Sequence, residues 1–84
     1  MPTDELVADV LAQLLETDPD TLTDETDLSA VQNWDSVNAL RVLMFLEREL
    51  AAALDFERYS AARTVGDLVA VADAARQPQP EPRP

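Results

Sequence analysis

Residues 35 to 50 of the chain read DSVNALRVLMFLEREL. Large apolar residues recur through this stretch at helical spacing, at Val37, Leu40, Leu43, Met44, Leu46 and Leu50. The pattern predicts an amphipathic helix that begins at Ser36 and extends to about Leu50, and the following run from Ala51 to Leu54 either continues it or leaves it. Asp35 stands directly before it and is a suitable N-cap, because its carboxylate can accept hydrogen bonds from the free N–H groups of the first turn.

Upstream of this stretch the chain predicts one more helix and then a long loop. Two series of apolar residues, each four apart, give residues 3 to 17 one broad apolar stripe, with Thr3 as the expected N-cap. The residue before a proline avoids helical backbone angles, so the helix should stop before Asp18-Pro19. Residues 18 to 35 have no helical period, and we expect an ordered loop held to the core by Leu22, Leu28 and Val31.

Downstream the chain predicts a short helix and a longer one. Residues 55 to 62 suffice for one short helix, with Phe56 and Tyr59 on its inward side. A last helix is expected from Val65 to about Ala75. Its first turn, in the run Thr64-Val65-Gly66-Asp67, resembles a capping box with aspartate in place of glutamate.

These segments define the expected fold class, which is all-α because no segment alternates as a β-strand would. We predict a four-helix bundle with a long loop between its first two helices and a short third helix. Residues 1 to 75 form the domain, and residues 76 to 84 form a disordered tail, since alternating prolines favour an extended, solvated chain. The expected core consists of Leu11, Leu15, Leu40, Leu43, Leu46, Val65 and Leu68.

The composition narrows the possible functions. The 84 residues include no cysteine and no histidine, so the chain has no thiolate ligand and lacks the commonest general base. The net charge of -11 repels nucleic acid and anionic membranes, and it attracts proteins with basic patches. No leader peptide or membrane span is visible. We therefore expect a cytoplasmic protein, and we further expect it to be a monomer. If it takes part in chemistry, a cofactor or a partner should supply the reactive group.

The acidic loop invites a calcium-site interpretation, which its spacing does not support. A helix–loop–helix calcium loop beginning at Asp18 needs a glycine at its sixth position and a glutamate at its twelfth. The chain has Thr23 and Ser29 at these positions, so we predict no metal site.

Ser36 is the candidate site of covalent attachment. At the start of a helix, free N–H groups and the helix dipole stabilise an anion such as a phosphate ester. The long loop before Ser36 leaves it accessible, and no histidine or lysine is next to it in sequence to activate it as a nucleophile. The simpler alternative is that Asp35 and Ser36 only cap the helix.

The run from Asp35 to Leu50 resembles the signature of acyl and peptidyl carrier proteins, in which Asp-Ser-Leu opens an apolar helix that closes in an acidic stretch. The run Thr64-Val65-Gly66-Asp67-Leu68 resembles the start of the fourth carrier helix, and the resemblance covers residues 4 to 75. It implies that a phosphopantetheinyl transferase attaches 4'-phosphopantetheine to Ser36, next to Asp35. The thiol of this arm would hold acyl, aminoacyl or peptidyl groups as thioesters.

The resemblance also implies a non-catalytic role in which the second helix docks partner enzymes. In such carriers this helix usually presents acids to the basic surfaces of enzymes that load or condense the cargo. The corresponding docking residues here are Val37, Leu40, Arg41, Met44 and Glu47. Asp35, Glu47 and Glu49 are expected to speed association with basic partners.

The chain departs from that signature at three positions. Val37 replaces the usual leucine, which is a conservative change, and Trp34 replaces a small residue, as in some carriers of secondary metabolism. Arg41 stands where fatty-acid carriers tend to have an acid. We therefore expect a carrier of a polyketide, nonribosomal peptide or related specialised pathway, and the position of Met1 close to the first helix favours a free-standing one. The alternatives are a fatty-acid acyl carrier protein and an unmodified helical interaction protein of the same fold.

Overall fold

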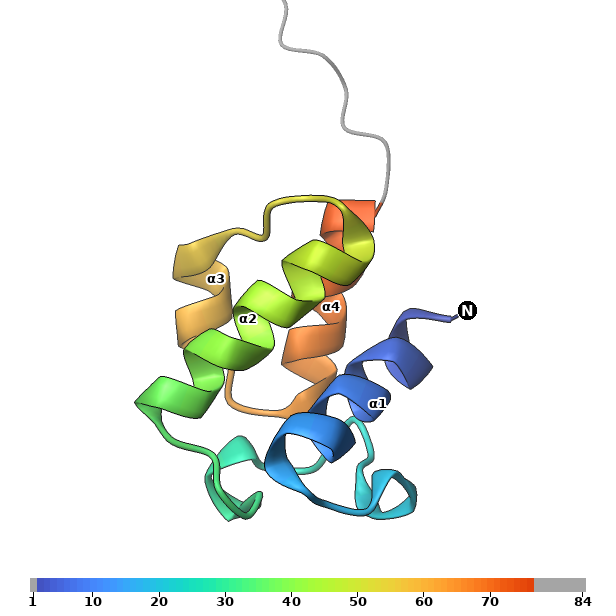
Figure 1. The fold of residues 1–84 in the computed structure, drawn as a ribbon, viewed down its shortest axis with the longest axis vertical. Coiled ribbons are helices and arrows are strands. Elements are labelled where there is room, and N and C mark those ends of the chain that lie inside the picture. The colour runs from blue at the N-terminus through green and yellow to red at the C-terminus, as the bar shows by residue number, and fades with distance from the viewer. Residues whose placement is uncertain (1, 77–84) are drawn as a thin grey trace, which may run out of the picture.

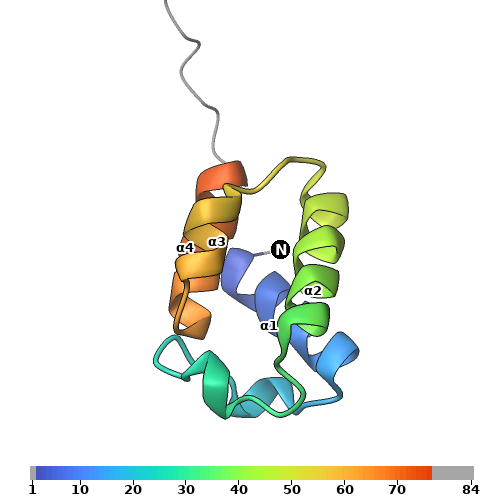
Figure 2. The same cartoon turned by 90° about the vertical axis from the view of Figure 1, so that its left-hand side faces the viewer.

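The computed structural model describes residues 2 to 76. This part contains the helices α1 (Thr3–Leu15), α2 (Ser36–Leu50), α3 (Phe56–Ala61) and α4 (Val65–Arg76), with two short 3₁₀ turns between α1 and α2. Residues 2 to 76 contain no strand, so the predicted all-α bundle with a short third helix is confirmed. α1 packs against α2 and α4, and α3 lies beside α4 (Figure 1 and Figure 2). Each of these helices is too short or too polar to cross a lipid bilayer.

The ends of α1 differ from the predicted ones. Pro2 is the N-cap, so the prediction of Thr3 was wrong: Thr3 is the first helical residue and is buried. Its hydroxyl donates to Asp73 Oδ1 at 3.0 Å and accepts from Arg76 Nη1 at 3.0 Å. These bonds to α4 replace the expected capping role. α1 also ends earlier than predicted, because Glu16 turns into left-handed backbone with φ of 55°.

The first residue of the expected tail belongs to a helix. Arg76 was assigned to the tail, but it is the last residue of α4 and its guanidinium contacts Thr3 at the start of α1. The two ends of the bundle are therefore joined through side chains. The rest of the expected disordered tail, residues 77 to 84, lies outside the described residues.

The connection between α1 and α2 is held to the bundle as predicted. Leu28 and Val31 are buried, and Leu22 packs against the core while partly exposed. Asp18 and Asp27 each cap one of the 3₁₀ turns with their carboxylates. The loop is thus ordered both by local caps and by apolar anchors.

The same loop also pairs with the start of α4. Val65 N donates to Thr26 O and Gly66 N donates to Asp24 O, both at 2.9 Å. A Cβ at position 66 would lie only 2.8 Å from Asp24 O. A residue with a side chain would force the loop and the helix apart, which explains the glycine at this position.

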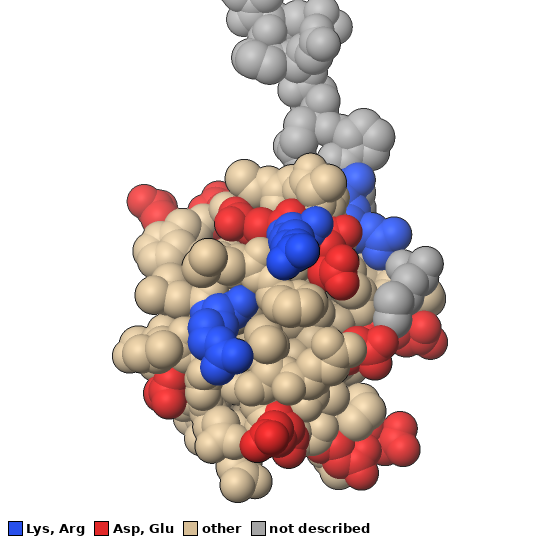
Figure 3. All heavy atoms as spheres, in the orientation of Figure 1, with Lys and Arg blue, Asp and Glu red and all other residues tan. Residues whose placement is uncertain are grey.

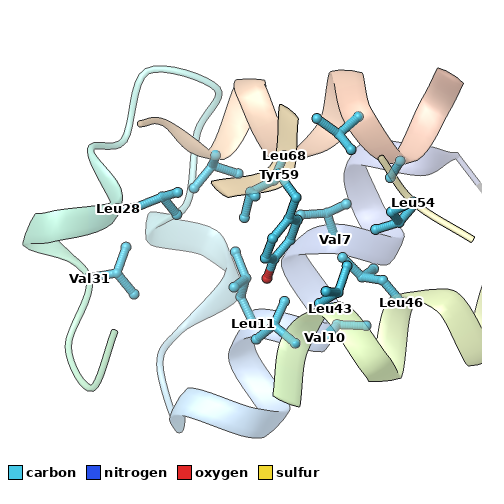
Figure 4. Packing of buried hydrophobic residues seen from close by; sticks show 14 of the residues in the cluster. Val7, Val10, Leu11, Leu28, Val31, Leu43, Leu46, Leu54, Tyr59 and Leu68 are labelled. Atoms are coloured by element: carbon cyan, nitrogen blue, oxygen red, sulfur yellow. The ribbon is translucent and has the colours of Figure 1, made fainter. Parts of the chain in front are cut away.

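The core lies between α1, α2 and α4, where side chains from all three helices converge (Figure 4). The buried residues of the predicted core are Leu11, Leu15, Leu43, Leu46, Val65 and Leu68. Leu40 was wrongly included, because its side chain is 49% exposed. α2 has apolar residues around much of its circumference, and the face that meets the bundle is the one with Val42, Leu43 and Leu46.

Only one of the two aromatic residues of α3 points inward. Tyr59 is buried, and its hydroxyl donates to Ala39 O of α2 at 2.6 Å. Burial raises the pKa of Tyr59, so the hydroxyl stays a donor. Phe56 was expected to face inward as well, but it is 56% exposed. Residues three apart on a helix differ by about 60° in direction, and in this short helix only Tyr59 points at α2.

The predicted capping box at the start of α4 is confirmed. Asp67 N donates to Thr64 Oγ1 at 3.1 Å. In return, Asp67 Oδ2 accepts from Thr64 N at 3.2 Å and from Arg63 N at 2.9 Å. These two backbone hydrogen bonds are the main cause of the lowered pKa of Asp67.

The charge of Asp67 should make part of the stability depend on pH. In the folded chain the pKa of Asp67 is below the ordinary aspartate value of about 3.9. The contribution of its charge to the free energy of unfolding is therefore complete above about pH 4, and it is lost as the pH falls through the folded pKa. Asp67→Asn should lower the urea midpoint at pH 7, and its difference from wild type should shrink below about pH 4. A difference that stays constant from neutral to acid pH would contradict a role of the charge.

Candidate functional site

Ser36 is the first residue of α2 and is exposed. Asp35 is the N-cap, as predicted: its carboxylate accepts from Asn38 N and its carbonyl from Ala39 N, both at 2.8 Å. Within residues 2 to 76, the Ser36 hydroxyl has no hydrogen-bond partner, and the N–H groups of Ser36 and Val37 have no acceptor. The hydroxyl therefore lies at the positive end of a 15-residue helix, next to two free donors.

Two asparagines fix the chain around Ser36. Asn33 has left-handed backbone with φ of 69°, which asparagine tolerates better than most residues. Its Nδ2 donates to Leu15 O, at the end of α1, at 2.9 Å. Asn38 Nδ2 reaches back from α2 and donates to Asn33 O at 2.8 Å. These bonds hold the start of α2 against the end of α1 and thereby set the position of Ser36.

A cleft of about 320 Å³ opens beside Ser36, between the first half of α2 and α3. It is lined by Trp34, Ser36, Ala39, Leu40, Phe56, Tyr59, Ser60 and Ala62. Leu40 and Phe56, which were both assigned to the interior, line this cleft. The sequence pattern thus identified two apolar residues correctly but did not show that they border the candidate site.

The face of α2 opposite the core is a row of alternating apolar and basic residues. At 3.6 residues per turn, one side of the helix carries, in order, Val37, Arg41, Met44 and Arg48. All four are exposed, and Val37 and Met44 are 68% exposed each. We call these four residues the α2 outer row. Leu40 lies at its edge, so four of the five expected docking residues are on the exposed side of α2.

Glu47, the fifth expected docking residue, has a structural contact. Its Oε2 accepts from the backbone N–H of Leu54 at 2.8 Å, and Leu54 is buried. This bond ties the end of α2 to the segment that leads into α3. It accounts for an acid at a helix end where the dipole disfavours one.

The Glu47 contact should be measurable as stability. Glu47→Ala removes the charged acceptor of a partly buried N–H group and should lower the free energy of unfolding by about 1–3 kcal/mol. Glu47→Gln keeps an acceptor oxygen and should lose less. Glu49→Ala is the matched control, since Glu49 is exposed and should change stability by less than about 0.5 kcal/mol. Urea unfolding at neutral pH measures all three. Equal losses for the two alanine variants would contradict the assigned role of Glu47.

Three positioning residues were missed by sequence reasoning. Asn38 had a local signal, because it is the third residue of the helix that Asp35 caps, and polar residues there often bond back to the chain before the helix. Asn33 had a weaker signal, as a residue that tolerates left-handed backbone within a loop. Tyr59 was expected to face inward, but no signal indicated its hydrogen bond to Ala39, which lies 20 residues away in sequence.

Comparison with known families gives one match. A family model described as phosphopantetheine attachment site matches residues 5 to 72, from α1 into α4, and the matched range includes Ser36. No individual curated protein gave a significant match. The family match covers most of the chain, and it agrees with the resemblance to carrier proteins in the cofactor it implies, 4'-phosphopantetheine. The chain therefore belongs to the phosphopantetheine attachment site family, the family of acyl and peptidyl carrier proteins.

Proposed function

We propose that Ser36 is the attachment residue, and that the chain carries acyl, aminoacyl or peptidyl groups on its 4'-phosphopantetheine arm and presents them to partner enzymes. The observation that supports Ser36 most directly is its exposed hydroxyl at the N-terminus of α2. The chain has two other serines. The hydroxyl of Ser29 donates to Asp27 Oδ1 at 2.7 Å, and Ser60 lies inside the short helix α3. Neither is at the start of a long helix.

The surroundings of Ser36 fit a phosphodiester. The free N–H groups of Ser36 and Val37 and the dipole of α2 stabilise a negative charge at this point. The carboxylate of Asp35 opposes such a charge, but it is already an acceptor for Asn38 N. The apolar cleft beside Ser36 offers a wall for the uncharged part of the arm.

The residue types present decide which tasks belong to the arm and which to the chain. The arm supplies a thiol, the reactive group that a chain without cysteine cannot provide. The chain's own residues position the arm: Asn33 and Asn38 fix the start of α2, and Tyr59 fixes α3 beside it. We assign the bond-forming chemistry to partner enzymes, beginning with a phosphopantetheinyl transferase.

We further propose a polyketide or nonribosomal peptide pathway as the context. The support is the α2 outer row, which carries Arg41 and Arg48 and no acid, together with Trp34 before the Asp-Ser pair. The alternative, a fatty-acid carrier, implies by the same resemblance a docking helix with acids on this face.

The experiment that tests the function is modification in vitro. The purified chain is incubated with a phosphopantetheinyl transferase and coenzyme A, and its intact mass is measured. We expect the mass of one phosphopantetheinyl group to be added to each chain. An unchanged mass with several transferases would instead favour the unmodified interaction protein.

A further inference from the structure

The α2 outer row is basic, although the chain as a whole is strongly acidic. Arg41 and Arg48 give the row two positive charges, against a net charge of -11 for the chain. Among the described residues, neither guanidinium pairs with a carboxylate, and Arg41 Nη1 donates to the neutral Asn38 Oδ1 at 3.1 Å. Figure 3, which views the molecule from the α2 side, shows one basic group surrounded by uncharged atoms and, above it, another with acidic atoms on both sides.

The acids of α2 lie off this row. Glu47 accepts from Leu54 N, and Asp35 caps the start of the helix. Glu49 follows Arg48 directly and therefore points about 100° away from it around the helix axis. The α2 outer row itself thus combines apolar contact area with two positive charges and no acid, and Glu47 and Glu49 follow on either side of its last residue.

We propose that the enzymes that act at Ser36, the transferase included, bind the α2 outer row through an apolar surface that carries carboxylates opposite Arg41 and Arg48. The inference rests on the proposed function, because it requires chemistry at Ser36. An enzyme that contacts Ser36 can also contact α2, because Ser36 is the first residue of this helix. The row begins at the next residue and extends roughly 16 Å along the helix, at 1.5 Å per residue.

Charge complementarity favours a partner surface that carries carboxylates. A basic docking surface would place like charges against Arg41 and Arg48, whereas carboxylates would pair with both. The remaining acidic surface of the chain repels an acidic partner, which restricts its binding to this one face. The net charge alone predicts a partner with a basic surface. The two arginines of the α2 outer row instead predict a partner whose contact surface is acidic.

The test compares a charge reversal in the row with the same reversal outside it. Arg58 is exposed on α3, so Arg58→Glu changes the net charge by the same amount as Arg41→Glu. Loading from coenzyme A is measured as kcat/KM at low and high salt with two transferases, one with an acidic carrier-binding face and one with a basic face. Arg41→Glu should lower kcat/KM about three- to tenfold with the acidic-faced enzyme and raise it similarly with the other.

The controls isolate the position of the charge. Arg58→Glu should change either rate by less than about twofold, Arg41→Lys should resemble wild type, and high salt should weaken every effect. Equal effects of Arg41→Glu and Arg58→Glu would overturn the proposal, because only net charge would then matter. The proposal would also be overturned if the wild-type chain formed a dimer that Arg41→Glu dissociates, because the row would then bind a second copy of the chain. Failure of the proposed function is seen separately, as the absence of any mass increase in the wild-type chain.

Discussion

The Ser36→Ala variant should gain no mass when it is incubated with a phosphopantetheinyl transferase and coenzyme A, whereas the wild-type chain should gain one phosphopantetheinyl group. The substitution removes the hydroxyl that would form the phosphodiester. It leaves the Asp35 cap intact, and the Ser36 hydroxyl bonds to no described residue, so the variant should fold like wild type. Intact-protein mass spectrometry measures the modification, and circular dichroism checks the fold.

Ser60 provides the matched control for this substitution. It is exposed and lines the same cleft as Ser36, but it belongs to α3. Ser60→Ala should therefore be modified to the same extent as wild type. Full modification of Ser36→Ala would show that another hydroxyl accepts the arm, and peptide mapping would then locate it.

The start of α2 could be predicted because Asp35 gives it a local signal. Its end could not be fixed in the same way, since the run from Ala51 to Leu54 was equally compatible with a longer helix, and the structure ends the helix through left-handed backbone at Ala51. The start of α1 could not be predicted in the same way. A threonine before two acids is typical of a cap, but Thr3 instead bonds to Asp73 and Arg76, some 70 residues away. No local pattern contains that contact.

The orientation of α2 was only partly predictable, because apolar residues surround much of this helix. Periodicity therefore allowed Leu40 to be placed in the core. The two arginines held a better signal: Arg41 and Arg48 are seven apart, in line with Val37 and Met44, and that line had to face outward. The candidate attachment site itself could be predicted, since Asp35 and Ser36 are adjacent in sequence. The hydrogen bonds that hold this site in place, from Asn33 to Leu15 and from Tyr59 to Ala39, could not be predicted because they join segments distant in sequence.

Leu46→Ala should be the most destabilising of the substitutions considered for α2. Leu46 is fully buried, on the face of the helix that meets the core. Its truncation removes apolar contacts and leaves a cavity, at a cost of about 2–5 kcal/mol in the free energy of unfolding. A domain of 84 residues has roughly 4–13 kcal/mol of stability at typical values per residue, so the loss would be a large share of the total.

Leu40→Ala makes the comparison decisive, because it removes the same side chain from the same helix at a position that is 49% exposed. Both variants gain the same helix propensity, so the difference between them reports burial alone. Leu40→Ala should cost less than about 1 kcal/mol, measured by urea unfolding under identical conditions. If both variants lost the same stability, α2 would be turned differently about its axis. The row of Val37, Arg41, Met44 and Arg48 would then no longer be its outward face, so this stability measurement also tests the geometry on which the docking inference depends.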